Sequence, residues 1–384
     1  MKKTLFATFF FPPEFGGIQT YLHGLISNLP PEKVVVLAKS GEETEEYDKK
    51  QPYPIYRTSF NSVLKFIKLS NLSFQKTLSR IIKKEHIEHV VLGHPLPLGI
   101  SCQIIKKRFK IPYSTFTHGK EITEALKDNT LHSRTLRGTL YNADHVFCTT
   151  HFMAKLLIDK CNVPLKAIKI IPPGVSPETF TEKISKEALK AKYGLTGKKV
   201  LITISRLVKR KGHDLVLNAL KIIVKSHPEV HYLIVGSGEE EKELKSLVIK
   251  VHLENHVTFI PHASNTDIKD LYTLSDIFVM PTRTISGDIE GFGIVYLEAA
   301  AAGLPVVATN TGGVAEAVVQ NTTGILLDDP ESIGENTFIG ELTKTLELLL
   351  ASKDKRDLLG MRAKKRVLAE FTWKKQSKKL EDVL

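Results

Sequence analysis

Short apolar runs rich in β-branched residues alternate with longer stretches of helical periodicity along the whole chain. A run that is apolar at nearly every position predicts a strand buried on both faces, and such strands belong to parallel sheets covered by helices. The strands predicted in the first half are Thr4–Phe10, Lys33–Ala38, Ile55–Ser59, His89–Gly93, Tyr113–Thr117, His145–Thr149 and Ile168–Ile171. Those predicted in the second half are Lys199–Ser205, His231–Gly236, Val257–Ile260, Ile277–Pro281, Pro305–Thr309 and Gly324–Leu327.

The alternation is interrupted once, by the sequence IPPGVSPETF at residues 171–180, whose three prolines and one glycine predict a linker. A chain of 384 residues also exceeds the usual size of one domain. We therefore expect an α/β protein of two facing, doubly wound domains, at residues 1–173 and 174–371. A final helix at about 372–384, which carries the only tryptophan of the chain, is expected to return to the first domain.

The bulk composition is that of an ordinary globular protein, with 42% hydrophobic and 25% charged residues. A formal net charge of +12 suggests an anionic partner, but no DNA-binding or RNA-binding signature is present, so nucleic acid is not expected. The three cysteines have no metal-like spacing and predict neither a disulfide framework nor a zinc site, which fits the cytoplasm. The apolar run Leu5–Phe11 is short and ends at a proline pair, so we interpret it as a buried strand rather than a signal peptide.

Two cations follow a predicted strand of the second half. Arg206 comes directly after the strand, and Lys211 precedes Gly212 and a predicted helix. Ligands of open α/β sheets bind beyond the carboxyl ends of the strands, where two cations would stabilise a departing diphosphate. We interpret the neighbouring Lys209 and Arg210 as part of a solvated basic loop.

Two carboxylates, Glu290 and Glu298, are separated by seven residues, and between them Gly291 and Gly293 lead into a helix predicted at Ile294–Ala302. Carboxylates are good acceptors for sugar hydroxyls, and the free N–H groups at a helix start suit an anion. We expect Glu290 to reach hydroxyl groups from the loop and Glu298 to take a ribose from the helix.

The first half contributes two further candidates. Gly16 and Gly17 stand between a strand and a helix, where a backbone without Cβ atoms can approach a diphosphate. His118 ends a predicted strand, although a lone histidine is more often structural. The dinucleotide fingerprint GxGxxG is absent from the chain, which argues against a nicotinamide enzyme.

In this order, the segments FPPEFGGIQTYL, THGKE, IPPGV, SRLVKRKG, VGSG and EGFGIVYLEAAAAGLPVVA resemble the retaining GT-B glycosyltransferases of family four over the whole chain. Within that family the sequence looks most like the GDP-mannose-dependent phosphatidylinositol mannoside mannosyltransferases. The resemblance implies transfer of a hexosyl unit, mannose from GDP-mannose, to a hydroxyl of a lipid-linked or glycan acceptor. It further implies retention of configuration, with no cofactor and no required metal.

The resemblance also implies a role for each matched residue. Lys120 departs from the family pattern after THG, which leaves the acceptor side less defined than the donor side. The diphosphate would lie on Arg206 and Lys211, the sugar on Glu290, the ribose on Glu298, with His118 beside the transferred sugar. Backbone support would come from Gly16, Gly17, Gly291, Phe292, Gly293 and Ile294, and the base would lie near Gly236, Ser237, His262 and Ala263.

Residues 61–84 hold six basic residues and no acid, with apolar residues at helical spacing. A basic amphipathic helix can lie on an anionic membrane, which would suit a lipid-linked acceptor on the inner face of the plasma membrane. A second basic run, Lys106–Lys110, lies in the same half. The alternative is that the apolar face packs on the sheet, as in any crossover helix.

Three other functions stay open at this point. A transferase of the same fold could use a UDP-sugar and move glucose, galactose or N-acetylglucosamine. A nucleotide-sugar 2-epimerase would share the two-domain fold but would work without an acceptor. A non-catalytic binding protein would have lost some of the matched residues, and none of them is lost here.

Overall fold

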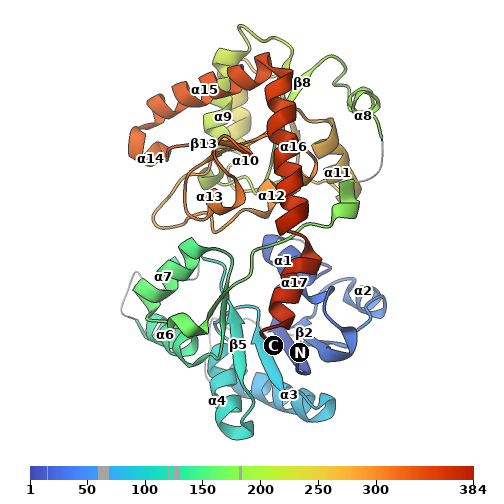
Figure 1. Ribbon diagram of the computed structural model, residues 1–384, viewed down its shortest axis with the longest axis vertical. Coiled ribbons are helices and arrows are strands. Elements are labelled where there is room, and N and C mark those ends of the chain that lie inside the picture. The colour runs from blue at the N-terminus through green and yellow to red at the C-terminus, as the bar shows by residue number, and fades with distance from the viewer. Residues whose placement is uncertain (15, 59–68, 120–121, 124–129, 181–183) are drawn as a thin grey trace. The chain divides into compact units, whose positions relative to one another are not determined.

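The computed structural model describes residues 1–14, 16–58, 69–119, 122–123, 130–180 and 184–384 (Figure 1). They divide into two compact units. Unit 1 comprises Met1–Gly174 together with Trp373–Leu384, and unit 2 comprises Val175–Thr372.

Unit 1 is built on a seven-stranded sheet with the order β3-β2-β1-β4-β5-β6-β7, in which all neighbouring strands are parallel. The direction of winding reverses between β1 and β4, which gives the doubly wound arrangement. The strands are β1 Thr4–Thr8, β2 Val34–Lys39, β3 Ile55–Thr58, β4 His89–Leu92, β5 Tyr113–Phe116, β6 Val146–Cys148 and β7 Ile168–Ile170.

Helices of unit 1 cover this sheet because every crossover between parallel strands must bury an apolar face. One large core joins residues of β1, β2 and β4 to apolar residues of α3, α4, α6 and α7. The terminal helix α17 packs against α1. The helices are α1 Gly17–Ile26, α2 Thr44–Lys49, α3 Leu69–Glu85, α4 Gly99–Phe109, α6 Leu131–Asn142, α7 His151–Cys161 and α17 Trp373–Glu381.

Unit 2 is also built on a parallel sheet, which has six strands in the order β10-β9-β8-β11-β12-β13. Successive residues of a strand enter different cores, as Leu201 and Ile202 do, so both faces of the sheet are buried. The strands are β8 Lys199–Ile204, β9 Val230–Val235, β10 Val257–Ile260, β11 Ile277–Met280, β12 Val306–Thr309 and β13 Gly324–Leu327.

The helices of unit 2 supply apolar residues to the two cores. Residues of α9, α10 and α15 enter one core, and residues of α8, α11, α12 and α16 enter the other. The helices are α8 Lys186–Lys192, α9 His213–Ile223, α10 Glu241–Lys250, α11 Asn265–Leu274, α12 Ile294–Ala301, α13 Val314–Ala317, α14 Pro330–Ile333, α15 Glu335–Ala351 and α16 Lys353–Glu370.

Each predicted strand is present, and the predicted α/β fold with two doubly wound sheets is confirmed. The predicted ends often extend too far because apolar residues continue into the loops. Thr4–Phe10, for example, was expected as one strand, but β1 ends at Thr8, whose hydroxyl accepts a hydrogen bond from the Phe10 amide at 3.0 Å and turns the chain. Within the predicted linker, Pro177–Phe180 forms a 3-10 turn, so this stretch is less irregular than its prolines suggested.

The only tryptophan, Trp373, begins α17 and lies against α1. A Cβ atom added at Gly24 of α1 would stand 2.4 Å from the indole ring. The ring also lies 6.4 Å from that of Tyr21, whose hydroxyl donates to the Ile171 carbonyl oxygen at 2.6 Å. Gly24 is therefore required for the close approach of the terminal helix.

We predict that Gly24→Ala displaces Trp373 and lowers the free energy of unfolding by about 1–3 kcal/mol, as overpacking of a core does. The tryptophan emission should shift to the red, and urea unfolding measures the loss. Gly138→Ala in α6 is the matched control, because a Cβ there meets nothing within 4 Å. It should leave the emission unchanged and be neutral or slightly stabilising, and equal effects of the two substitutions would contradict the packing argument.

Candidate functional site

The loop after β8 carries the two predicted cations. Arg206 is exposed just beyond the strand, and Lys211 ends a 3-10 turn. Gly212 then adopts a left-handed conformation with φ 73°, and a Cβ there would lie 2.0 Å from the carbonyl oxygen of Pro281. Only glycine fits this junction, so the loop is held tightly against the end of β11.

The carboxylate of Glu290 lies in a compact ion cluster with cations of this loop. Its Oε2 accepts from Lys211 Nζ at 2.5 Å and from Arg210 Nη1 at 2.8 Å. Arg210 Nε also lies 3.3 Å from Oδ2 of Asp288. We call Arg210, Lys211, Asp288 and Glu290 the Glu290 cluster.

The cluster strongly perturbs the protonation of its members. Burial alone would raise the pKa of Glu290, but Lys211 and Arg210 lower it from its ordinary value of 4.5 to about 2. Burial lowers the pKa of Lys211 most, and the charges of Arg210 and Arg206 lower it further. Arg206 therefore lies in the electrostatic neighbourhood of Lys211, and Glu290 remains ionised at neutral pH.

The interpretation of Arg210 as a solvated loop residue is wrong. Its side chain is only 10% exposed, whereas that of the adjacent Lys209 is 52% exposed and pairs with Asp214 at 2.6 Å. Two consecutive basic residues look alike in a sequence. Only the packing of the loop decides that Arg210 turns inward to Glu290.

Glu298 lies in the second turn of α12, in a different environment. The hydroxyl of Tyr272 donates to its Oε2 at 2.9 Å, and burial raises its pKa. The two predicted carboxylates thus differ, because one has two cationic partners and the other has a neutral hydroxyl.

The glycine-rich turn between the two carboxylates has the predicted form, with α12 beginning at Ile294. Gly293 has φ 84°, and a Cβ there would meet the ring of Tyr296 at 2.5 Å. The side chain of Phe292 is buried, 5.8 Å from the ring of Phe371. At Phe292, therefore, only the backbone is available to a ligand.

The base-side candidates follow β9 and β10. Gly236 has φ 124°, and a Cβ there would stand 2.1 Å from the carbonyl oxygen of Ser205. Ser237 O accepts from the Leu207 amide at 2.8 Å, so this turn braces the loop that carries Arg206. His262 is exposed and Ala263 is half-buried beyond β10. These residues lie at the carboxyl edge of the unit 2 sheet, as do Arg206, Lys211 and Glu290.

Two features of this edge were not predicted from the sequence. Arg283, buried beyond β11, binds both carboxylate oxygens of Asp214 at 2.6 and 2.9 Å, and its amide donates to the Arg210 carbonyl oxygen at 2.8 Å. Beyond β12, the Gly313 amide donates to Glu290 O at 3.0 Å, and a Cβ at Gly312 would stand 2.3 Å from that oxygen. The Gly-Gly pair after a predicted strand was a usable signal for the second feature.

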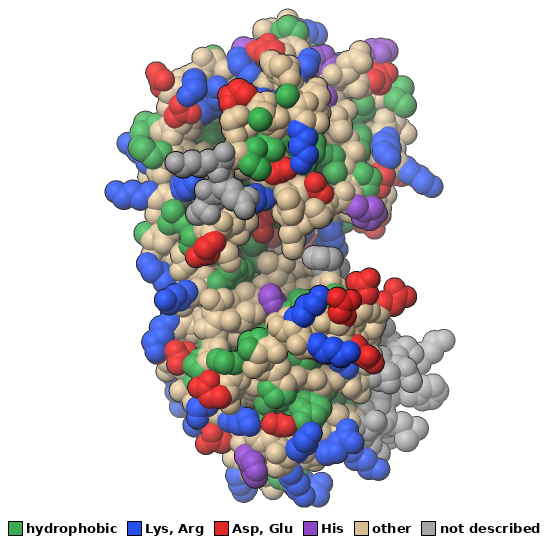
Figure 2. Space-filling view, turned by 90° about the vertical axis from the view of Figure 1, so that its right-hand side faces the viewer, with side chains coloured by type: hydrophobic (Ala, Val, Ile, Leu, Met, Phe, Trp, Pro, Cys, Tyr) green, Lys and Arg blue, Asp and Glu red, His purple; other side chains and the backbone are tan. Residues whose placement is uncertain are grey.

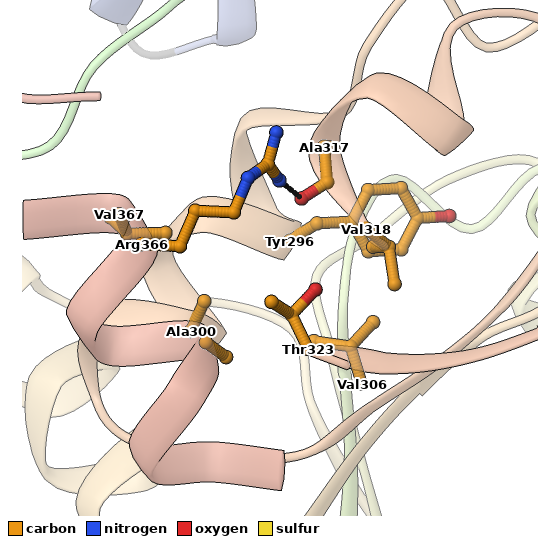
Figure 3. Close-up of a pocket in the computed structure, with 9 residues that line it drawn as sticks. Tyr296, Ala300, Val306, Ala317, Val318, Thr323, Arg366 and Val367 are labelled. Atoms are coloured by element: carbon orange, nitrogen blue, oxygen red, sulfur yellow. Dashed lines mark hydrogen bonds between the residues drawn. The ribbon is translucent and has the colours of Figure 1, made fainter. Parts of the chain in front are cut away.

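The underside of α12 closes on a narrow, mostly apolar cavity (Figure 3). Tyr296 and Ala300 line it from α12, and the Arg366 guanidinium from α16 donates to the Ala317 carbonyl oxygen at 2.8 Å. The Tyr296 hydroxyl donates to Met280 O at 2.9 Å, at the end of β11. We interpret the cavity as a packing gap behind the helix that carries Glu298.

Unit 1 has its own candidates at the carboxyl ends of β1 and β5. Gly16 and Gly17 are exposed at the start of α1, and a Cβ on Gly16 would overlap the Gln19 side chain. His118 Nε2 lies 2.7 Å from Gly93 O, so Nε2 carries the proton. The His94 ring, which was not predicted, lies 4.5 Å from that of His118, and burial lowers the pKa of His94 to about 2.

Comparisons with known proteins identify the family of the chain. A family described as Glycosyltransferase Family 4 matches residues 15–179, and one described as Glycosyl transferases group 1 matches residues 185–366. A GDP-mannose-dependent monoacylated alpha-(1-6)-phosphatidylinositol monomannoside mannosyltransferase of Corynebacterium glutamicum is 30% identical, with 100% of this chain and 98% of the relative covered. The chain belongs to the group 1, family 4 glycosyltransferases.

Other relatives of this glycosyltransferase chain are also similar over their full length. A GDP-mannose-dependent alpha-(1-6)-phosphatidylinositol monomannoside mannosyltransferase of Mycolicibacterium smegmatis is 28% identical, with 97% of this chain and 96% of the relative covered. The structure of Anabaena HepE in complex with UDP matches with a TM-score of 0.82 at 19% identity, covering 100% of this chain and 99% of HepE. WaaG matches with a TM-score of 0.74 at 18% identity and 99% coverage of both chains. The predicted GT-B fold is confirmed.

We predict that Glu290→Gln destabilises the protein at pH 7 by roughly 3–5 kcal/mol, because two buried cations lose their carboxylate. The pKa of Glu290 is lower in the folded state than its ordinary value, so its stabilising contribution is present above pH 4.5 and is lost as the pH falls towards 2. The difference in the free energy of unfolding between wild type and variant, measured with urea, should therefore be smaller at pH 3 than at pH 7. Glu239→Gln, at an exposed position, should not change the free energy of unfolding at either pH. A Glu290→Gln effect that does not depend on pH would contradict the lowered pKa of Glu290.

Proposed function

We propose that this glycosyltransferase is a retaining, GDP-mannose-dependent α-mannosyltransferase that acts on a hydroxyl group of a lipid-linked acceptor of the phosphatidylinositol mannoside class. The observation that carries the proposal is the full-length similarity to mannosyltransferases with that donor and that acceptor. The contact of Lys211 with Glu290 beyond the ends of the unit 2 strands, with Arg206 close enough to lower the pKa of Lys211, supports a donor site there.

The leaving group determines what this edge must do. Cleavage of the bond between sugar and diphosphate leaves negative charge on the diphosphate and positive charge on the sugar. The exposed guanidinium of Arg206, the Lys211 ammonium and the amino end of α12 would stabilise the diphosphate. No step of this proposal requires a metal or a cofactor.

Glu290 is suited to binding rather than to proton transfer. A carboxylate with a pKa of about 2 is a weak base, and two cations already occupy one of its oxygens. We assign it to hydroxyl groups of the donor sugar, and Glu298 to the ribose. The incoming hydroxyl would attack from the side of the departing phosphate, which can take its proton, so that configuration is retained.

Other roles follow the family resemblance. The base would lie near His262 and Ala263, with Gly236 and Ser237 beside it. In unit 1, Gly16 and Gly17 would approach phosphates and acceptor, and His118 would assist the developing positive charge on the sugar.

Contact with an anionic membrane would bring the enzyme to such an acceptor. Residues 61–68 of the predicted basic helix lie outside the described residues. In the described part, Phe74, Leu78, Ile81 and Ile82 of α3 are buried in the core, so that apolar face is not free to enter a bilayer. The opposite side presents the exposed cations Lys76, Arg80, Lys83 and Lys84.

These four cations recur at helical spacing, and we call them the α3 basic stripe. Figure 2 shows many Lys and Arg side chains on the surface facing the viewer. None of the helices in the described ranges is long and apolar enough to span a membrane. On the basis of the α3 basic stripe, we propose peripheral, electrostatic attachment at the inner face of the plasma membrane.

We predict that GDP and GDP-mannose raise the melting temperature more than UDP, ADP and their sugars do. A ligand at 100 times its Kd stabilises by about 2.7 kcal/mol, which thermal unfolding detects easily. Lys211→Ala should abolish most of the shift, and Glu290→Ala should abolish transfer of mannose. If only a UDP-sugar stabilises the protein, the proposed mannosyltransferase activity is wrong, but the membership in the glycosyltransferase family still holds.

Membrane attachment gives a separate prediction. Replacement of Lys76, Arg80 and Lys83 by Glu should release the protein from vesicles rich in anionic phospholipid, since each basic residue contributes about 1 kcal/mol near such a surface. Because the apolar face is buried, wild-type binding should also be lost at high salt. Sedimentation with vesicles measures both effects, and salt-resistant binding would contradict purely electrostatic attachment.

A further inference from the structure

Under the proposed function, Lys211 has two anionic partners in succession. In the structure Lys211 Nζ lies 2.5 Å from Glu290 Oε2. The donor diphosphate would bind the same ammonium group. Glu290 must then be held by another cation if it is to stay in place for the sugar. Arg210 is the other cation in contact with it among the described residues.

The geometry of Arg210 suits this task. Nη1 binds Glu290 Oε2 at 2.8 Å, and the Arg210 carbonyl oxygen accepts from the Arg283 amide at 2.8 Å. Nε lies 3.3 Å from Asp288 Oδ2, which is an ion-pair contact without a hydrogen bond. A guanidinium group can face two carboxylates from a rigid plane, whereas an ammonium group on a flexible stem is a point charge that changes partners more easily. Arg210 is thus anchored on both its backbone and its side chain.

Glu290 is held through its backbone as well as through its carboxylate, which Arg210 binds. Its carbonyl oxygen accepts from the Gly313 amide at 3.0 Å, and Gly312 packs closely against the same oxygen. The backbone of Lys211 is also held, at Gly212, but its ammonium group is carried on a flexible four-carbon stem. An exchange of partners would therefore move the ammonium group and leave the carboxylate in place.

The charges balance in both arrangements. Without a donor, Arg210 and Lys211 face Asp288 and Glu290, while Arg206 is exposed to solvent. With a donor, Arg206 and Lys211 would face the two negative charges of the diphosphate, and Arg210 would remain with the carboxylates. No buried carboxylate would be left without a cation.

We propose that Arg210 is a positioning residue for glycosyl transfer, which stays bound to Glu290 while Lys211 exchanges Glu290 for the donor diphosphate. Arg210 then acts on the sugar through Glu290 and does not touch the phosphates. The inference rests on the proposed function, because it takes the diphosphate of a nucleotide sugar as the second partner of Lys211.

The test measures nucleotide affinity and turnover together. Arg210→Met should lower kcat for mannose transfer by about 100-fold, as loss of a preorganised charge does. It should also weaken GDP binding in calorimetry, because the exchange of Lys211 would then leave Glu290 without a cation. Arg210→Lys should restore part of the lost kcat. Lys211→Met removes the diphosphate contact itself and should weaken GDP binding by at least about 10-fold. Lys209→Met removes the neighbouring exposed charge of the same loop and should change neither quantity.

A second variant addresses the case in which Arg210→Met does not fold. Asp288→Asn removes only the outer partner of Arg210, on a side chain that is 35% exposed, and should lower kcat several-fold with GDP affinity unchanged. The proposal is overturned if neither Arg210→Met nor Asp288→Asn lowers kcat. It is also overturned if adding Glu290→Gln to Arg210→Met does not restore GDP affinity, since Glu290 is then not the group that the exchange leaves unpaired. A wild-type protein that binds no GDP would contradict the proposed function instead, and the variants would then be compared with the nucleotide that stabilises it.

Discussion

The contact of Glu290 with Arg210 and Lys211 joins loops that are about eighty residues apart in the chain. Each of these charges would be costly to bury alone, so they are stable only together. The ion pair between Arg283 and Asp214, in the first turn of α9, joins the same two regions of the chain a second time. This edge of unit 2 therefore depends on paired charges, because ion pairs hold together the segments beyond β8 and β11.

The sheet makes this matching possible. Parallel strands end at one edge, so the loops that follow β8, β11 and β12 meet there. Close approach of those loops requires glycine at Gly212 and Gly312, where a Cβ would collide with backbone oxygens. The parallel sheet therefore brings the loops together, and the close contact of the loops in turn brings the paired charges together.

The environment then distinguishes groups of the same type. Two cations lower the pKa of Glu290, while burial beside the Tyr272 hydroxyl raises that of Glu298. Retaining glycosidases place two carboxyl groups on either side of the bond that they cleave, and one of them is the nucleophile. Glu290 and Glu298 are instead bound to cations and to a hydroxyl group, which suits an enzyme that stabilises a leaving group. In unit 1, burial likewise lowers the pKa of His94, whose ring lies 4.5 Å from that of His118.

The sequence by itself determined the two doubly wound sheets, the presence of every predicted strand and the start of α12 at Ile294, because apolar periodicity and glycine spacing are local signals. Its assignment of Arg206, Lys211, Glu290 and Glu298 to a donor site stays a prediction. Only the tertiary structure decided that Arg210 is buried while Lys209 is exposed, that Arg283 binds Asp214, and that His94 lies against His118. Those outcomes depend on which distant loop each side chain meets. The sequence pattern does not show which distant residues become neighbours, because ion pairing and burial arise only when the chain has folded.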